Sequence, residues 1–461
     1  MTARRLLPLL LLLPGGPAFG HASEQSFVLL LPTDVYAGAG VAAVAATVLL
    51  LAVLPPHAAG ALFRPLPLWH LRPARGRTAV SLVSFAVLAA LIGTGLLGPR
   101  DPLGNPLPLA IWTIWWIGLV ALQGLLGDFW GWINPWTGPL AVTRTLTQVR
   151  APLRYPRRLG FAPAVVSFLG FAAVLLADPA PSDPARLARM VAGYWLYGYL
   201  GGVLFGPVWL LRGEGLTVLM RAYARLAAPG RVRGRRALGL PGWRLLRAPP
   251  VPVGLAVFVL LMLGSGSFDG LNETFWWYGV LGLNPLEYPG RTALILPTLA
   301  GLLAANAALV AAFALCVRAG LRLARANLPL AYAFRLFAPA ILPIALGYHI
   351  GHYLTALLVD GQYVLAWASD PLLRGADLLG LGPHPVSTGF LNRKDSVRTV
   401  FLAQAGAVVA GHVLAVLLAH AQAVRIFGGN RRAALSQAPL AGFMVLYTLF
   451  GLWLLASPRA G

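Results

Sequence analysis

Two histidines lie in the middle of a long apolar stretch, where ionisable side chains are rare. The stretch runs from Ile341 to Gln362 and contains His349 and His352. On a helix, residues three apart occupy neighbouring positions on one side. Ionisable groups in hydrocarbon are costly, so they usually face a protein interior and mark a function. The pair could supply half of a metal site or part of a proton relay. It could also only join helices, through hydrogen bonds to carbonyls.

A third metal ligand would have to come from a different helix. Asp360 follows His349 by eleven residues, or about 16 Å along a continuous helix, whereas first-row metals bind their ligands at about 2 Å. His412 lies in a neighbouring apolar stretch that runs antiparallel, within about one helical turn of the depth of His349. We therefore regard His412 as the best candidate to join His349 and His352 around a divalent transition metal.

Three other acidic residues are close to the ends of apolar stretches. Asp269 and Glu273 are four residues apart, so on a helix they would lie on one side. The pair could carry out acid–base chemistry, or it could be a solvated loop or helix cap. Asp128 ends another stretch, where a helix-end group or an arginine partner is favoured over a metal ligand. Cys316 is the only cysteine, which excludes an intrachain disulfide and a thiolate metal cluster.

The composition places these residues in a membrane protein. Of 461 residues, 58% are hydrophobic and only 11% are charged, against about 25% charged in a typical soluble protein. The apolar residues recur in blocks of about 20, the length of helix that crosses about 30 Å of hydrocarbon. We predict an all-α fold, a polytopic transmembrane helix bundle of about ten spans. The predicted spans are Val35–Leu54, Ala79–Leu97, Leu109–Leu126, Phe161–Leu176, Val191–Leu211, Val251–Leu263, Ala293–Cys316, Phe337–Val359, Val397–Ala419 and Leu440–Leu455.

The N-terminus and the arginines predict the orientation of the bundle. Arg4-Arg5, an apolar run and small residues give residues 1–20 the layout of a secretory signal peptide, which leaves residues 21–461 as a single transmembrane domain. The net charge is +22, and the arginines gather in alternate loops. By the positive-inside rule these loops are cytoplasmic, and both termini of the mature chain lie outside. The basic cluster at Arg231–Arg236 fits membrane topology and contact with anionic lipids. Nothing else supports a nucleic-acid partner.

Several short stretches occur together in a recognisable order. They are Gly127–Trp136, Arg212–Gly215, Gly266–Gly270, His352–Thr355 with Gly361-Gln362, Gly411–Val413, Ala419-His420, Ser436-Gln437 and Gly451–Trp453. In this order they resemble a family of bacterial polytopic membrane proteins commonly labelled fenitrothion hydrolase. The resemblance covers most of the chain after the predicted signal peptide. It implies a hydrolase of organophosphate triesters in the bacterial inner (cytoplasmic) membrane.

The implied reaction is chemically consistent with the histidines. A neutral phosphotriester is lipophilic and would concentrate in the bilayer. A metal-bound hydroxide could attack phosphorus while the metal polarises the P=O or P=S group. Under this hypothesis His349, His352 and His412 bind the metal, and Asp360 accepts a proton. The expected partners are the lipid bilayer and a lipophilic small molecule.

Two other functions are compatible with the same residues. A membrane transporter or metal-ion-handling permease would use the buried histidines and the outer carboxylates to line a pathway. A structural subunit would hold them for packing beside a partner membrane subunit. The hydrolase predicts turnover in detergent without any gradient, whereas the transporter predicts counterflow in liposomes and no product.

Overall fold

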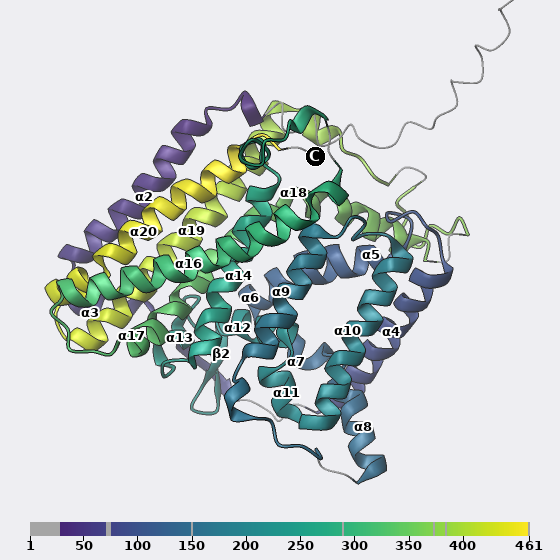
Figure 1. Ribbon diagram of the computed structural model, residues 1–461, viewed down its shortest axis with the longest axis horizontal. Coiled ribbons are helices and arrows are strands. Elements are labelled where there is room, and N and C mark those ends of the chain that lie inside the picture. The colour runs from purple at the N-terminus through teal and green to yellow at the C-terminus, as the bar shows by residue number, and fades with distance from the viewer. Residues whose placement is uncertain are drawn as a thin grey trace, which may run out of the picture.

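The computed structural model is almost entirely helical. It describes residues 28–70, 75–148, 151–287, 290–371, 374–382 and 385–459. Within these residues the regular strands form one small three-stranded sheet, and long helices make up the rest of the framework (Figure 1). The prediction of an all-α helical bundle is therefore confirmed. The predicted signal peptide, residues 1–20, lies outside the described residues.

In the described residues, eight helical segments are long and apolar enough to cross a membrane. Each overlaps one of the predicted spans, so these helices are compatible with an integral membrane protein. They are α2 (Thr33–Val53), α4 (Arg77–Leu97), the run of α5 (Pro106–Pro108), η1 (Leu109–Leu119) and α6 (Val120–Leu126), α14 (Val253–Asn272), the run of η4 (Arg291–Leu294) and α16 (Ile295–Leu323), the run of α17 (Leu330–Phe337), η5 (Ala338–Ile341) and α18 (Leu342–Ser369), α19 (Lys394–Phe427), and α20 (Asn430–Ala456).

The other two predicted spans differ from simple membrane helices. The first is α9 (Ala162–Ala177), which is apolar but has only 16 residues. The second is divided into α10 (Pro184–Phe205) and α11 (Pro207–Arg212). Between them Gly206 has a φ of 70°, a conformation that favours glycine, and Pro207 begins a new helix. The predicted count of about ten spans is therefore not confirmed.

Short elements connect the long helices. They are α3 (Pro56–Leu62), β1 (Leu66–His70), α7 (Trp130–Ile133), α8 (Thr137–Thr147), η2 (Arg157–Leu159), α12 (Gly215–Ala224), β2 (Pro229–Val232), β3 (Arg235–Leu238), α13 (Trp243–Arg247), α15 (Phe275–Val280), η3 (Pro285–Glu287) and η6 (Gly389–Asn392). The strands are antiparallel in the order β1–β3–β2. Between β2 and β3, Arg233 and Gly234 have φ values of 47° and 76°, and positive φ at both central residues suits the twist of a hairpin.

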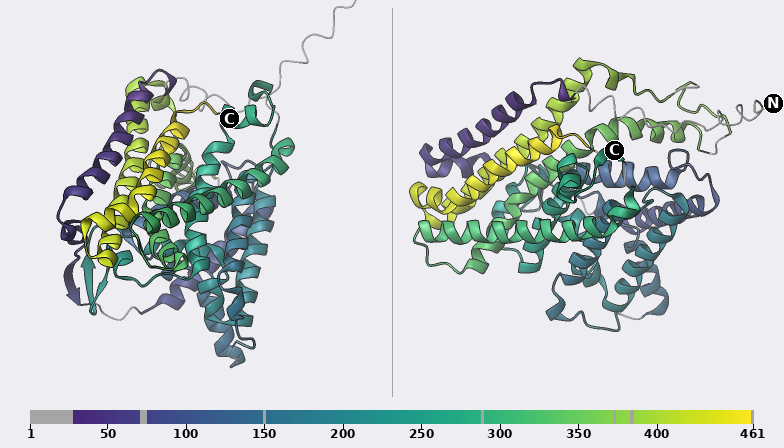
Figure 2. Two further views of the ribbon diagram at one scale, coloured as in Figure 1. Left: turned by 60° about the vertical axis from the view of Figure 1, so that its left-hand side comes forward. Right: turned by 45° about the horizontal axis from the view of Figure 1, so that its top comes forward.

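Helices α18 and α19 approach each other closely along a line of glycines. A Cβ atom at Gly347 would lie 2.4 Å from the carbonyl oxygen of Ala407, and one at Gly411 would lie 2.5 Å from that of Pro343. Side chains cannot fit at such distances, so glycine is required for the two backbones to meet. We call Gly347, Gly351 and Gly411 the glycine seam. On the other side of α19 lie α2 and α20, which run beside each other in both figures (Figures 1 and 2).

One buried polar network joins α10, α12 and the segment before α8. Glu214 is fully buried and caps α12, accepting two backbone N–H groups at 2.7 Å each, while the Tyr194 hydroxyl also donates to its carboxyl group. The Thr217 hydroxyl accepts hydrogen bonds of 3.1 Å from the Trp130 indole and the Asn134 amide. We call these five residues the Glu214 network. Because its central carboxylate and hydroxyl groups all have partners, it holds the short helices in one arrangement.

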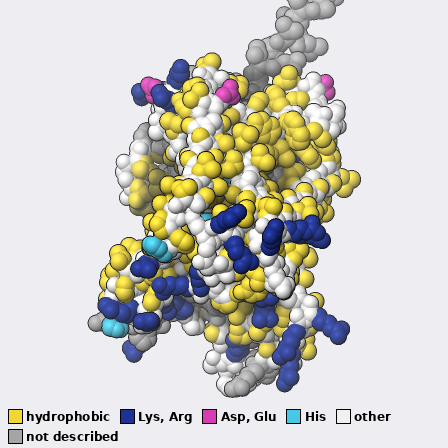
Figure 3. All heavy atoms as spheres, turned by 90° about the vertical axis from the view of Figure 1, so that its left-hand side faces the viewer, with side chains coloured by type: hydrophobic (Ala, Val, Ile, Leu, Met, Phe, Trp, Pro, Cys, Tyr) yellow, Lys and Arg dark blue, Asp and Glu magenta, His cyan; other side chains and the backbone are white. Residues whose placement is uncertain are grey.

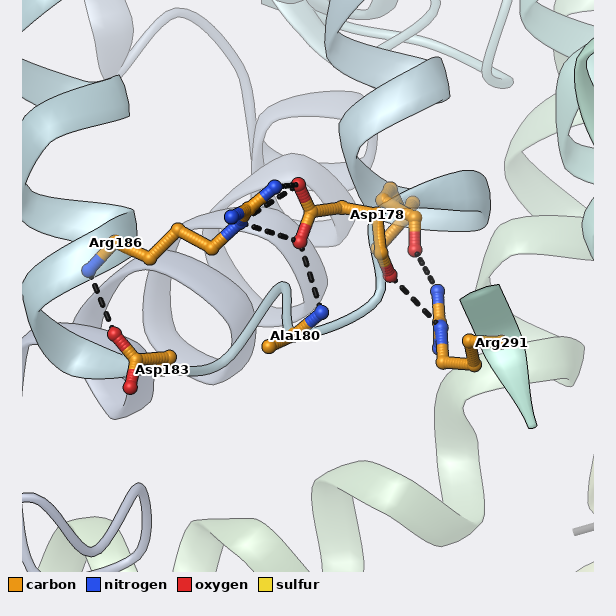
Figure 4. Close-up of polar contacts among 6 residues, drawn as sticks. Asp178, Ala180, Asp183, Arg186 and Arg291 are labelled. Atoms are coloured by element: carbon orange, nitrogen blue, oxygen red, sulfur yellow. Dashed lines mark hydrogen bonds and ion pairs between the residues drawn. The ribbon is translucent and has the colours of Figure 1, made fainter. Parts of the chain in front are cut away.

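Asp178 and Arg291 tie together the ends of α9, α10 and η4. The Asp178 carboxylate receives the Arg186 Nε at 2.8 Å and Nη2 at 2.7 Å, and also the Ala180 N–H at 2.9 Å (Figure 4). Arg291 donates to three carbonyl groups at the end of α9, among them that of Asp178 at 3.0 Å. Arginine at such a position satisfies carbonyl groups that have no partner within the helix.

Charge is distributed unevenly over the molecular surface. On the face in Figure 3, the acidic side chains lie at the upper edge, and most lysine and arginine side chains lie across the middle and lower part. Apolar side chains cover much of the surface between them. Exposed leucines such as Leu97, Leu296 and Leu446 are 90%, 77% and 67% exposed, which is the pattern of helices that face lipid rather than water.

Candidate acid–base site

The site forms where α14 and α18 cross. Asp269 is in the last turn of α14, and its Oδ2 atom lies 3.2 Å from Nε2 of His352 in the middle of α18. The side chains are 9% and 6% exposed. The hydroxyl group of Tyr353, the next residue on α18, donates to the same carboxylate oxygen. Two donors thus converge on one buried carboxylate.

The hydrogen bond to Asp269 fixes the role of the His352 ring. An ionised carboxylate only accepts hydrogen bonds, so Nε2 of His352 carries the proton that it donates. In the neutral ring, Nδ1 is then an acceptor. This is the arrangement in which a carboxylate orients an imidazole and stabilises its protonated form.

Three polar atoms beside this pair have no hydrogen-bond partner among the described residues. They are Nδ1 of His352, Nε2 of His349 and the hydroxyl oxygen of Tyr348, all buried. Buried polar groups are nearly always paired, so a group of unpaired atoms in one place indicates bound water or a functional role. The cluster therefore has spare hydrogen-bonding capacity that packing alone does not explain.

Gly270 allows the tyrosine and histidine rings to stand against α14. A Cβ atom at Gly270 would lie 2.0 Å from the Tyr348 hydroxyl oxygen and 3.6 Å from Nδ1 of His352. The two rings stack with centroids 5.7 Å apart and an angle of 11° between their planes. A side chain at this position would displace Tyr348, so glycine maintains the site.

His349 faces a cluster of tryptophans on a π-helical segment. Its ring lies edge-on to the Trp116 ring, with centroids 5.0 Å apart, and at 5.0 Å from the Tyr353 ring. Trp116 belongs to η1, which is π-helical throughout. Segments of π-helix are rare and frequently occur at functional sites. The segment sets Trp116 as a wall between His349 and the aromatic residues of α9.

A small cavity lies against these side chains. Its volume is about 30 Å³, and Asp269, His349, His352, Tyr348 and Tyr353 all line it. This is room for about one or two water molecules. Apolar side chains make up most of the remaining wall: Trp116, Phe168, Phe171, Leu175, Leu219 and Met262. A few convergent polar groups within an apolar wall are typical of a small-molecule site.

The predicted metal ligands do not form one group. Among the described residues, no set of three or more His, Cys, Asp or Glu side chains is placed to hold a metal ion. His349 and His352 line the same cavity. His412 is 1% exposed on α19, where its Nδ1 atom lies 2.9 Å from the carbonyl oxygen of Val408 and its ring lies 6.4 Å from that of Tyr447. Nε2 of His352 faces Asp269 instead of a shared metal position.

The structure also shows where the acidic residues singled out from the sequence lie. Asp360 is partly buried in α18, outside the residues that line the cavity. Asp269 and Glu273 separate: Asp269 enters the site, whereas Glu273 is 43% exposed and lies 3.6 Å from Arg459. Asp128 accepts the Gly131 N–H at 2.9 Å, in agreement with the helix-end role.

Sequence reasoning missed the partnership between Asp269 and His352 and the roles of Tyr348 and Tyr353. The available signal was a carboxylate placed within one turn of the end of an apolar helix, inside the Gly266–Gly270 stretch. Helical spacing gave the face of each residue but not which helices are neighbours.

No family model matches the chain, and comparisons with curated proteins and with solved structures also give no match.

Proposed function

We propose that this integral membrane protein is a hydrolase of lipophilic esters, of which neutral organophosphate triesters are the leading class, and that Asp269 and His352 supply its acid–base chemistry. The observation that carries the proposal is the buried Asp269–His352 pair, 3.2 Å apart, on the wall of a water-sized cavity with otherwise apolar walls. The resemblance to proteins labelled fenitrothion hydrolase supplies the substrate class.

In the proposed reaction, His352 acts as a general base. Nδ1 of His352 takes a proton from a water molecule while the water oxygen forms a bond to phosphorus. The bond from phosphorus to the leaving aryloxide or alkoxide then breaks, and the proton returns from His352 to the departing oxygen. Asp269 orients the ring and stabilises its protonated form, and Tyr353 in turn hydrogen-bonds to Asp269. The net reaction consumes one water molecule and gives a diester and an alcohol or phenol.

The apolar surroundings suit a substrate that arrives through the bilayer. Phe168, Phe171 and Trp116 contribute to a wall that excludes bulk water, and electrostatic interactions inside such a wall are stronger than in water. The free energy needed to transfer a lipophilic triester from the bilayer into this environment would be small. At about 30 Å³ the cavity must widen to admit a whole substrate.

That small volume favours a second candidate function, a proton-coupled transporter or metal-ion-handling permease. Ionisable groups within a span often belong to proton relays. The pair Asp269–His352 could bind and release a proton, and the unpaired Nε2 of His349 could continue the path. This function would need no room for a whole ester beside the pair.

The two functions are separated by an assay of the purified protein. In detergent, with no gradient, the hydrolase should release the phenol from fenitrothion and from a series of aryl dialkyl phosphates, faster with better leaving groups. Failure to release product from any of these esters, together with proton or solute counterflow in liposomes, would overturn the hydrolase and support the transporter.

A metal-dependent form of the hydrolase can be tested in the same preparation. That form requires His349, His352 and His412 to bind a metal, whereas the acid–base form requires Asp269 beside His352 and no metal. Elemental analysis of the purified protein beside a His349→Ala/His412→Ala variant distinguishes them. Stoichiometric metal that is lost in the variant would favour the metal-dependent form. Equal metal content in both proteins would remove it.

A further inference from the structure

A groove lined by three arginines lies at the end of α16. Arg318 and Arg322 are four apart and lie on one side of α16, and Arg325 follows just after the end of the helix. Together with Asn327 they line a hollow of about 410 Å³. The groove shares none of the residues that line the cavity at the acid–base site.

The arginines in this groove lack a counter-charge. Within the described part of the chain, none of the three forms an ion pair with a carboxylate. A neighbouring arginine, Arg432, already occupies the free carbonyl groups of the helix end, donating to those of Ala324 and Arg325 at 3.4 Å each. Three guanidinium groups beside one hollow therefore have a combined positive field with no acidic partner described for them.

The backbone at Arg325 is unusual for an arginine. Its φ is 47°, and the Ala326 N–H bonds to the carbonyl oxygen of Leu321 at 2.9 Å. The Arg325 N–H bonds to the carbonyl of Arg322 at 3.0 Å, which completes a Schellman motif. Glycine is the residue that normally takes the left-handed position of this motif. At Arg325 a residue with a Cβ atom adopts this strained conformation, and its side chain lines the groove.

Apolar side chains line the groove beside the arginines, among them Leu328 and Leu330. Leu330, at the start of α17, is 37% exposed, and Leu315 and Leu323 on α16 are 64% and 53% exposed. Because α16 is one of the helices that could span a membrane, its charged end would stand at the height of the lipid head groups. Guanidinium groups bind phosphate oxygens in pairs with matched geometry.

We propose that this groove binds the phosphodiester of an anionic membrane phospholipid, with Arg318, Arg322 and Arg325 as the phosphate-binding residues. The lipid chains would lie along the exposed leucines of α16 and α17. A phospholipid is favoured over a soluble phosphate compound because apolar and cationic side chains meet at the same groove.

The proposal can be tested by counting lipids bound to the full-length protein in a neutral detergent by native mass spectrometry. The probes are dioleoyl phosphatidylglycerol, dioleoyl phosphatidylcholine and inorganic phosphate. We expect the phosphatidylglycerol to bind more tightly than the phosphatidylcholine, and Arg322→Gln and Arg325→Gly each to weaken it about fivefold. Arg100→Gln, which removes an exposed arginine from the loop after α4, is the matched control and should leave binding unchanged.

Thermal denaturation distinguishes a loss of lipid binding from a loss of folding in the variants. Arg325→Gly places glycine in the left-handed position, so it should keep or raise the melting temperature while it weakens lipid binding. Equal affinity for the two lipids would overturn the proposal, as would equal weakening by Arg100→Gln. Inorganic phosphate that displaces phosphatidylglycerol at the same concentration would assign the groove to a soluble phosphate ligand instead.

Discussion

The acid–base site and the Glu214 network are both buried polar clusters on helices, and they differ in how fully their atoms are paired. In the Glu214 network the carboxyl group receives two backbone N–H groups and a tyrosine hydroxyl. At the acid–base site, Nδ1 of His352, Nε2 of His349 and the Tyr348 hydroxyl have no partner among the described residues. A satisfied cluster fixes a fold, whereas unsatisfied atoms beside a cavity retain capacity for a ligand or a reaction.

The largest expected effect is on catalysis, from Asp269→Asn. The asparagine keeps the size of the side chain but cannot stabilise a protonated His352, so we expect turnover to fall by about 100-fold or more. The melting temperature should change little. Glu273→Gln is the matched control, since Glu273 is 43% exposed and lies outside the cavity. Equal activity of Asp269→Asn and the unmodified protein would remove the acid–base site from the mechanism.

Glu214→Ala should have the opposite effect to Asp269→Asn: we expect it to reduce stability and to leave turnover per folded molecule nearly unchanged. It leaves two N–H groups of α12 and the Tyr194 hydroxyl without an acceptor, so we expect a loss of about 3 kcal/mol in the free energy of unfolding. Chemical denaturation in detergent measures the loss, with exposed Glu287→Ala as control. A folded Glu214→Ala protein that has lost all turnover per molecule would show that the two clusters are not separable in function.

A pair of glycine substitutions on α14 sharpens the comparison within one helix. Gly270→Ala would place a Cβ atom 2.0 Å from the Tyr348 hydroxyl oxygen, whereas the Cβ of Gly266→Ala would lie 3.7 Å from the nearest atom of that ring. We expect Gly270→Ala to cost about 1–3 kcal/mol through overpacking. Gly266→Ala should be neutral or stabilising by up to about 1 kcal/mol, because alanine favours helix. The melting temperatures of the two variants, measured by thermal denaturation, test this difference. Equal melting temperatures would mean that the Tyr348 side chain moves aside without cost.

The smallest effect concerns the Asp178–Arg186 pair, which lies outside both clusters. Burial raises the pKa of Asp178, but hydrogen bonds from Arg186 and the Ala180 N–H lower it by more. The pKa of Asp178 therefore lies below its usual value. The stability from this carboxylate is therefore present above about pH 4 and is lost as the pH falls through its lowered pKa. Asp178→Asn should flatten the acid limb of a stability–pH profile slightly. An unchanged profile would show that the pair contributes nothing.

The sequence predicted the helices well because hydrophobic length is a local property. Eight predicted spans coincide with helices long and apolar enough to cross a membrane. The predicted span Val191–Leu211 does not coincide with one helix, because Gly206 divides it between α10 and α11. A single positive φ cannot be recognised from hydrophobicity, and the apolar character continues across it.

The site was predicted only in part, because its key contact joins residues far apart in the chain. His349 and His352 were identified from their unusual setting, and both line the cavity. Asp269 lies 83 positions before His352, and the contact depends on α14 packing against α18. Helical periodicity orients each side chain but does not choose the neighbouring helix, so His412 was selected on depth alone. The grouping of three histidines around a metal stays a prediction without a matching cluster among the described residues.

The glycine seam has a mechanical consequence for any enlargement of the cavity. At Gly347 and Gly411 the backbones of α18 and α19 meet with no side chain between them. Sliding one helix past the other by a fraction of a turn would force carbonyl oxygens into Cα atoms, so we expect α18 and α19 to move together. Enlargement of the cavity would then come from the other walls, to which η1, α9, α12 and α14 contribute.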